Sequence, residues 1–159
     1  MEIATPNNVS DYLISFAHST GDVITNLKLQ KLLFYSQAWY LALKDDYIFE
    51  EDFQAWVHGP VLVSQYQRFR HYSYHPISED ITEPDIPQEL INHLNEIMDV
   101  FGGEGAYTLE RLVHQESPWI ESRDNLDQTE PSTNIISKEK MKTFYKQMAE
   151  MQNAEDSAF

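Results

Sequence analysis

The residues best suited to chemistry are the six histidines, because the chain contains no cysteine. Without cysteine there is no disulfide, no thiolate metal site and no thiol nucleophile. His71 and His75 lie four positions apart, a spacing that could hold a metal ion on one helix face. Pro76 follows directly and disfavours an intact helix at that point. We therefore expect no metal site there.

A second histidine sequence, His114-Gln115-Glu116, has the spacing used by zinc deaminases, in which the glutamate moves protons. Those enzymes also require a cysteine pair, which this chain lacks. A Ser-His-Asp triad stays open, because its members meet in space and not in sequence. The glycine cluster at 102–105 indicates a helix end, since no lysine follows it as in a phosphate-binding loop. The sequence predicts no catalytic residue and no cofactor.

The element that must position any site is the stretch from Thr25 to Leu43. It has no glycine or proline and is rich in strong helix formers. Apolar residues occupy one face of the expected helix, and aromatic and small residues occupy a second face. Such a helix must be buried in the middle of the domain. Thr25 or Asn26 is the expected N-cap.

Further amphipathic stretches predict helices over residues 8–18, 61–72, 87–101 and 108–113, a helical turn from Ser117-Pro118, and a last helix after Ser137. The expected N-caps are Asn7 or Asn8, Asp85, Thr108 and Ser137. Pro60 is expected at the first position of the helix over 61–72.

A small β element is expected near residues 53–58, where Phe53, Ala55 and Val57 alternate with other residues. Its predicted partner in a hairpin is the aromatic segment that begins at His71. The expected fold class is mainly α: a single compact helical domain around a buried central helix at about 25–43. We expect one domain over 1–151 and a flexible tail over 152–159.

The charge is strongly negative, with 26 acidic against 11 basic residues and a net charge of −15. Such a chain repels phosphate, so general nucleic-acid or membrane binding is disfavoured. The best helix-turn-helix candidate, 61–72 with Arg68 and Arg70, lies in this acidic context. The acidity either attracts a basic partner or only aids solubility. There is no long apolar segment and no basic leader, which fits a cytoplasmic protein.

Several ordered sequence blocks occur together between Leu27 and Arg123. They read LKLQKLLFYSQAWYLAL, F-x-A-W-V-H-G-P-V, Y-x-x-F and L-x-x-L-V-H-Q-E-S-P-W-x-x-x-R. In these blocks the chain resembles the Panacea domain family, which includes GepA-like phage-associated proteins and SocA-like antitoxins. Two positions depart from the expected pattern, with serine at 36 and tyrosine at 40.

The resemblance implies an antitoxin, associated with prophages or mobile elements, that neutralises a cognate protein toxin by direct contact. One branch of the family acts as an adaptor that delivers its toxin to the ClpXP protease. The family positions, either structural or toxin-binding, are Lys31, Leu32, Tyr35, Trp39, Trp56, His58, Gly59, Pro60, Val61, Tyr66, His114, Glu116, Pro118, Trp119 and Arg123.

Some of these residues carry specific structural expectations. Lys31 and Arg123 are cations among apolar neighbours, so each needs a carboxylate or carbonyl partner if buried. Glu116 is the expected partner of Arg123. The three tryptophans at 39, 56 and 119 are expected to pack near one another, and His114 is expected to bond a backbone group near Trp119.

The aromatic residues around the central helix and the His58-Gly59-Pro60 turn fit either a core or a binding face. The segments outside the blocks, before Leu27 and after 137, are candidates for distinguishing one toxin from another. Rival functions are a DNA-binding autoregulator and a hydrolase that uses His58 or His114.

Overall fold

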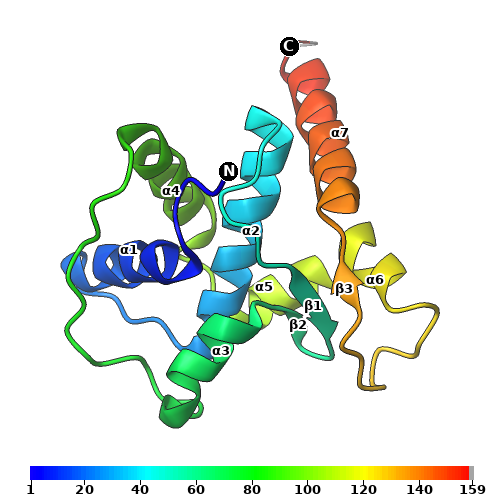
Figure 1. Cartoon of the computed structure of the whole chain (residues 1–159). Coiled ribbons are helices and arrows are strands. Elements are labelled where there is room, and N and C mark those ends of the chain that lie inside the picture. The colour runs from blue at the N-terminus through cyan, green and yellow to red at the C-terminus, as the bar shows by residue number, and fades with distance from the viewer. Residues whose placement is uncertain (158–159) are drawn as a thin grey trace.

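The computed structural model describes residues 1–157, and helix α2 (Asn26–Lys44) runs through its middle (Figure 1). Fifteen of its 19 residues are buried, on every side of the helix. Thr25 caps it, because its hydroxyl accepts the backbone N–H of Lys28 at 3.2 Å. Asp45 ends it in the left-handed conformation, with φ of 57°. The predicted buried central helix at 25–43 is confirmed.

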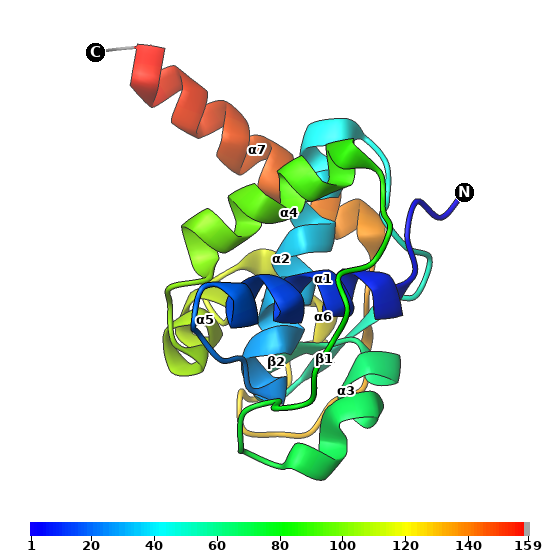
Figure 2. The same cartoon turned by 90° about the vertical axis from the view of Figure 1, so that its left-hand side faces the viewer.

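Six further helices of the described chain surround α2. They are α1 (Pro6–Ser19), α3 (Val63–Phe69), α4 (Gln88–Phe101), α5 (Ala106–Val113), α6 (Ser117–Ser122) and α7 (Lys138–Ser157). Figures 1 and 2 show α1 and α4 on one side of α2, with α7 on the other. The predicted mainly α fold is confirmed.

The N-caps of the helices agree with the predicted ones only in part. Ser137 caps α7 as predicted, accepting the backbone N–H of Lys140 at 3.1 Å. Three other predicted caps are wrong. The observed N-caps of α1, α4 and α5 are Thr5, Pro87 and Gly105, in place of Asn7 or Asn8, Asp85 and Thr108.

A three-stranded antiparallel sheet lies against the lower half of α2 in Figure 1. Its strands, in spatial order, are β2 (Gly59–Val61), β1 (Phe53–Trp56) and β3 (Ile135–Ile136). Gln54 pairs with Val61 on one side and with Ile135 on the other. The hairpin predicted near 53–58 is confirmed, and β3 is an addition that sequence reasoning missed.

Two expectations around this hairpin are wrong. Pro60 lies in β2 opposite Ala55, not at a helix start, so α3 begins only at Val63. A short 3₁₀ helix over Arg70–Tyr72 then follows α3. The segment after His71 does not pair with β1; its Pro76 bridges instead to Thr25.

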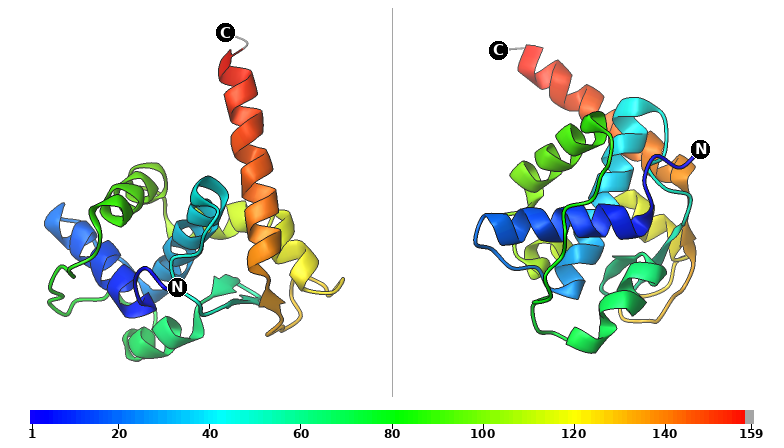
Figure 3. Two further views of the ribbon diagram at one scale, coloured as in Figure 1. Left: turned by 45° about the horizontal axis from the view of Figure 1, so that its top comes forward. Right: turned by 60° about the vertical axis from the view of Figure 1, so that its left-hand side comes forward.

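Helix α7 packs along α2 through its first half and then extends past the body of the protein (Figures 1 and 3). It remains helical to Ser157, although residues 151–156 are exposed. The flexible tail expected over 152–159 concerns motion and stays a prediction, and residues 158–159 lie outside the described part. No described helix has both the length and the apolar character needed to cross a bilayer.

Candidate functional site

The family-motif residues separate into two neighbourhoods. Around the hairpin lie Lys31, Trp56, His58, Gly59, Pro60, Tyr66, His114, Trp119 and Arg123, joined by the contacts described below. Tyr35, Trp39 and Glu116 line a different surface beside α4 and α7. The motif is therefore shared between two regions of the structure.

Arg123 fastens the sheet to the loop that follows α6. Its guanidinium donates to the backbone carbonyls of Ala55 at 2.9 Å and Asp127 at 3.0 Å, and also to that of Glu130. The side chain is buried and lies over the Trp119 ring. The expected partner Glu116 is wrong, because backbone carbonyls accept the hydrogen bonds of the two terminal guanidinium nitrogens.

The three tryptophan rings have different neighbours. Trp119 donates its indole N–H to the backbone carbonyl of Trp56 at 2.8 Å. The Trp56 ring itself packs edge-on against Tyr66, 5.0 Å between centroids. Trp39 packs against Tyr145 near α7. The expected mutual packing of the three rings is therefore wrong.

His114 helps to hold the same hairpin. Its ring stacks on Trp119 at 4.1 Å and lies beside the backbone of Val57. That backbone group belongs to the hairpin turn and not to the chain around Pro118. Burial lowers the pKa of His114, and the nearby Glu110 carboxylate partly opposes this effect. The imidazole is thus held neutral in a structural position.

Lys31 is almost fully buried beneath the hairpin turn, with 1% of its surface exposed. Its amine makes no hydrogen bond within residues 1–157. Burial lowers the pKa of Lys31 to about 8, although the Glu110 carboxylate raises it. A Cβ on Gly59 would lie 3.3 Å from Lys31 Cε, so the turn packs directly on this side chain.

The tip of the hairpin is tied to α5 by a hydrogen bond between His58 and Glu110. His58 Nδ1 lies 2.6 Å from Glu110 Oε1, with 72% of the His58 side chain exposed. Gly59 has φ of +114°, a conformation that side-chain-bearing residues rarely adopt. Together with Arg123 and Trp119, these contacts fix the hairpin in one position.

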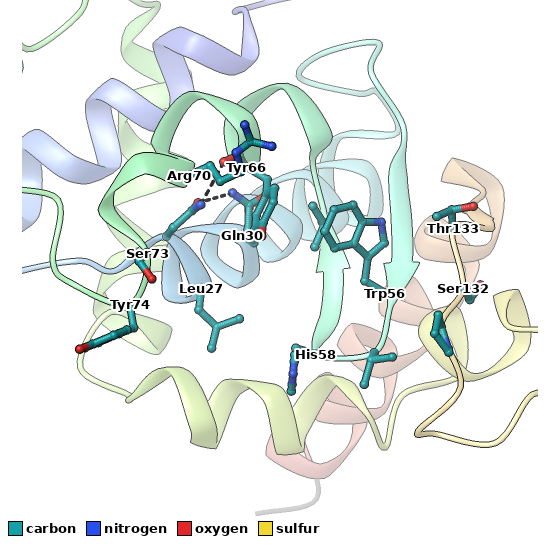
Figure 4. A pocket seen from close by; sticks show the side chains of 14 residues that line it. Leu27, Gln30, Trp56, His58, Tyr66, Arg70, Ser73, Tyr74, Ser132 and Thr133 are labelled. Atoms are coloured by element: carbon teal, nitrogen blue, oxygen red, sulfur yellow. Dashed lines mark hydrogen bonds between the residues drawn. The ribbon is translucent and has the colours of Figure 1, made fainter.

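An open hollow of about 620 Å³ lies beside the hairpin (Figure 4). We call it the hairpin pocket. Its lining is Asn26, Leu27, Gln30, Trp56, Val57, His58, Val61, Tyr66, Arg70, Ser73, Tyr74, Pro131, Ser132 and Thr133. No lining residue is acidic, although 26 of the 159 residues of the chain are. Arg70 is exposed and supplies a cation at its edge.

Hydrogen bonds brace the floor of this pocket. Asn26 donates to the Tyr66 carbonyl at 3.0 Å and accepts from Gln30 at 2.9 Å, as Figure 4 shows. Gln30 in turn accepts the Leu62 N–H at 2.9 Å. The polar groups of the floor are therefore already paired, which leaves the aromatic and apolar surfaces for contact with a partner.

Glu116 forms the centre of the second neighbourhood. The phenols of Tyr35 and Tyr145 both donate to its Oε1, at 2.6 and 2.9 Å. Burial raises the pKa of Glu116, while the two phenolic hydrogen bonds lower it. Burial and this carboxylate also raise the pKa values of both tyrosines. The stacking of Tyr35 on Phe101 adds rigidity.

Sequence reasoning missed several of these residues. Tyr145 lies in the last predicted helix, and the available signal of its role was its phenol, which needs a partner when buried. Glu110 and the loop 131–133 carry no signal of their own. His71 and His75 are both exposed and lie beside tyrosines. Within residues 1–157 no three His, Cys, Asp or Glu residues are grouped as metal ligands.

The fold and its surface define a small helical protein with a rigid hairpin and open, partly aromatic hollows. A family model described as "Antitoxin SocA-like, Panacea domain" matches residues 29–120, more than half of the chain. The protein therefore belongs to the SocA-like Panacea antitoxin family. No curated protein matches it. No solved structure matches it either.

Proposed function

We propose that this protein is an antitoxin that neutralises a cognate protein toxin by direct binding, without catalysis. The observation that carries the proposal is the family match over residues 29–120, which contains the whole hairpin. The resemblance to GepA-like proteins supports a prophage or mobile-element setting, and we place the activity in the cytoplasm.

The hairpin pocket is the surface that we assign to toxin contact. Leu27 is 41% exposed and Tyr74 is 81% exposed beside the paired rings of Trp56 and Tyr66. Tyrosine and tryptophan commonly dominate binding energy at interfaces. Since Arg123 and Trp119 already hold the hairpin in place, little conformational entropy is lost when a partner binds. Occlusion of the toxin surface is the mechanism.

Co-expression with the toxin gene tests this function. We expect the antitoxin to restore growth that the toxin alone arrests, and to co-purify with it. Tyr74→Ala and Leu27→Asp should weaken binding at least about tenfold, as hot-spot truncations do. Tyr107→Ala is the matched control, because Tyr107 is 69% exposed and does not line the hairpin pocket. Growth arrest that persists despite soluble antitoxin contradicts the proposal.

The net charge of −15 supports a basic toxin as the partner. Opposite charges accelerate encounter, and salt screens this acceleration. The association rate should therefore fall steeply as salt rises from low to physiological concentration. A rate that does not change with salt removes the electrostatic part of the proposal and leaves the binding part intact.

A protease adaptor that delivers the toxin to ClpXP is the second candidate. The feature that favours it is the exposed end of α7, residues 151–156, which extends past the body and away from β1 and β2 (Figures 1 and 3). This end offers a second attachment point. Toxin lifetime in the presence of ClpXP should shorten on addition of the antitoxin if delivery is the mechanism, and lengthen or stay constant under occlusion.

A further inference from the structure

A second open hollow, of about 500 Å³, lies between α4 and α7 with α2 and α5 at its base. We call it the α4–α7 groove. Its lining is Tyr35, Trp39, Leu43, His93, Glu96, Ile97, Val100, Phe101, Leu112, Glu116, Met148, Ala149, Gln152 and Asn153. It shares no lining residue with the hairpin pocket. Figure 1 shows α4 and α7 on opposite sides of the upper part of α2.

The groove exposes apolar side chains that helices normally cover. Leu43 is 53% exposed, Val100 is 65% exposed and Leu112 is 38% exposed, each from a different helix. Met148 on α7 completes the apolar lining. A partner that covers these side chains removes their apolar surface from water, which favours binding. Its walls are helices, and a helix is the element that packs between helices.

The charge of the groove is negative. Glu96 and Glu116 are in its lining, which contains no lysine or arginine. Cations on the same side are already paired: Lys44 lies 3.5 Å from Glu89, and Lys146 lies 3.4 Å from Asp45. A cationic partner is therefore complementary to this surface, whereas an acidic segment is repelled.

Glu116 adds a specific polar contact at the base of the groove. Both tyrosine phenols donate to its Oε1, and Oε2 accepts no hydrogen bond within residues 1–157. The residue is 6% exposed, so this carboxylate is largely removed from water. A guanidinium or ammonium group from a partner would donate to the remaining oxygen and compensate its charge.

We propose that the α4–α7 groove binds a basic amphipathic helix of the toxin. Apolar side chains of that helix pack on Leu43, Val100 and Met148, and one lysine or arginine donates to Glu116. The identification of the partner as the toxin rests on the proposed function. The chemistry of the binding segment rests on the groove alone.

A synthetic peptide tests the groove without the toxin. The probe is a fluorescein-labelled leucine–lysine peptide of about 18 residues, roughly 27 Å as a helix, with leucines on one face. Its control has the same composition with the leucines dispersed around the helix. Fluorescence anisotropy should show that the amphipathic peptide binds at least about tenfold tighter than the dispersed one. Equal binding of the two peptides would overturn the proposal.

Variants locate the binding. Val100→Asn and Leu43→Asn should each weaken the affinity for the peptide at least about fivefold, whereas the matched control Tyr107→Asn should leave it unchanged. Glu116→Gln should weaken binding of the lysine peptide, but not of a peptide in which glutamine replaces every lysine. The new amide oxygen can still accept hydrogen bonds from both phenols. Unchanged affinity in Val100→Asn overturns the proposal. The proposal is also overturned if the antitoxin forms a dimer that Val100→Asn dissociates. A second copy of the chain, and not a toxin helix, would then fill the groove.

The two proposals fail in different ways. Peptide binding at the groove together with no rescue from the toxin contradicts the antitoxin function alone. If the Val100→Asn variant still rescues growth and the peptide does not bind, only the proposal for the α4–α7 groove is contradicted.

Discussion

Trp119 donates its indole N–H to the backbone carbonyl of Trp56 at 2.8 Å, and so joins α6 to the last residue of β1. The residues are 63 positions apart in sequence. Arg123, one turn beyond Trp119, adds a bond to the Ala55 carbonyl from the same helix end. The hairpin is therefore positioned by the α6 region more than by its own short strands, which alone would be marginal.

The first prediction concerns Arg123. Arg123→Ala should lower the free energy of unfolding by about 3 kcal/mol, because three buried or half-buried carbonyls lose their donor. Urea unfolding measures the change. The matched control is Arg111→Ala, an exposed arginine on α5 for which a change within about 0.5 kcal/mol is expected. Similar losses in both variants would contradict the role assigned to Arg123.

The second prediction compares two glycines. Gly59→Ala should destabilise the protein by about 1–3 kcal/mol. Its φ is +114°, and the new Cβ would lie 3.2 Å from Val113 Cγ1. Gly103→Ala is the control, because no atom lies within 4 Å of its added Cβ and its φ is not in the left-handed region. A thermal midpoint equally low in both variants would show that the turn is not constrained.

The third prediction is a pH dependence from Lys31, whose pKa is about 8 when folded against 10.5 ordinarily. Between these values the unfolded chain holds a proton that the folded chain has released, so stability should rise as pH rises from about 8. Lys31→Met lacks this rise and should be more stable than the natural protein at pH 7, by up to about 3 kcal/mol.

Subtracting the two unfolding curves removes the contributions of other groups, including the tyrosines. The difference between variant and natural protein should shrink as pH increases from 8 to 10. A difference that stays constant over this range would mean that Lys31 keeps its proton in the folded protein.

The fourth prediction concerns the two phenols on Glu116. Tyr145→Phe should cost about 1–2 kcal/mol of stability, since the buried carboxylate loses one donor. Removing Tyr35 and Tyr145 together should cost more than the sum, because Glu116 Oε1 then has no donor. Tyr107→Phe, at an exposed position, controls for the change of residue type. A strictly additive double variant would refute the coupling.

The central helix was predictable because local composition and wider packing agree there. Nineteen residues without glycine or proline, apolar on two faces, allow few alternatives to a buried helix. Helix starts were less predictable: Asp85 is a strong local cap, yet α4 begins after Pro87, where the chain arrives from its crossing over α1. Strand β3 has only two residues, which leaves no periodicity to detect.

The site was predictable as a set of residues but not as a set of pairs. Arg123 and Glu116 are close in sequence and opposite in charge, yet they bond different partners. Tyr35 is 81 positions from Glu116, and no local pattern relates the two. Pro60 was assigned to a helix start because proline is favoured there. Its actual place in β2 depends on the left-handed turn at Gly59, which no local pattern indicates.

Burial of α2 on every side has a consequence for hydrogen exchange. If one neighbouring helix frays, the backbone amides of α2 remain protected from solvent, because the other neighbouring helices still cover it. They should therefore exchange with deuterium only when the whole molecule opens, and their exchange free energy should equal the global unfolding free energy. The last turns of α7, in contrast, should exchange within the dead time of a manual experiment.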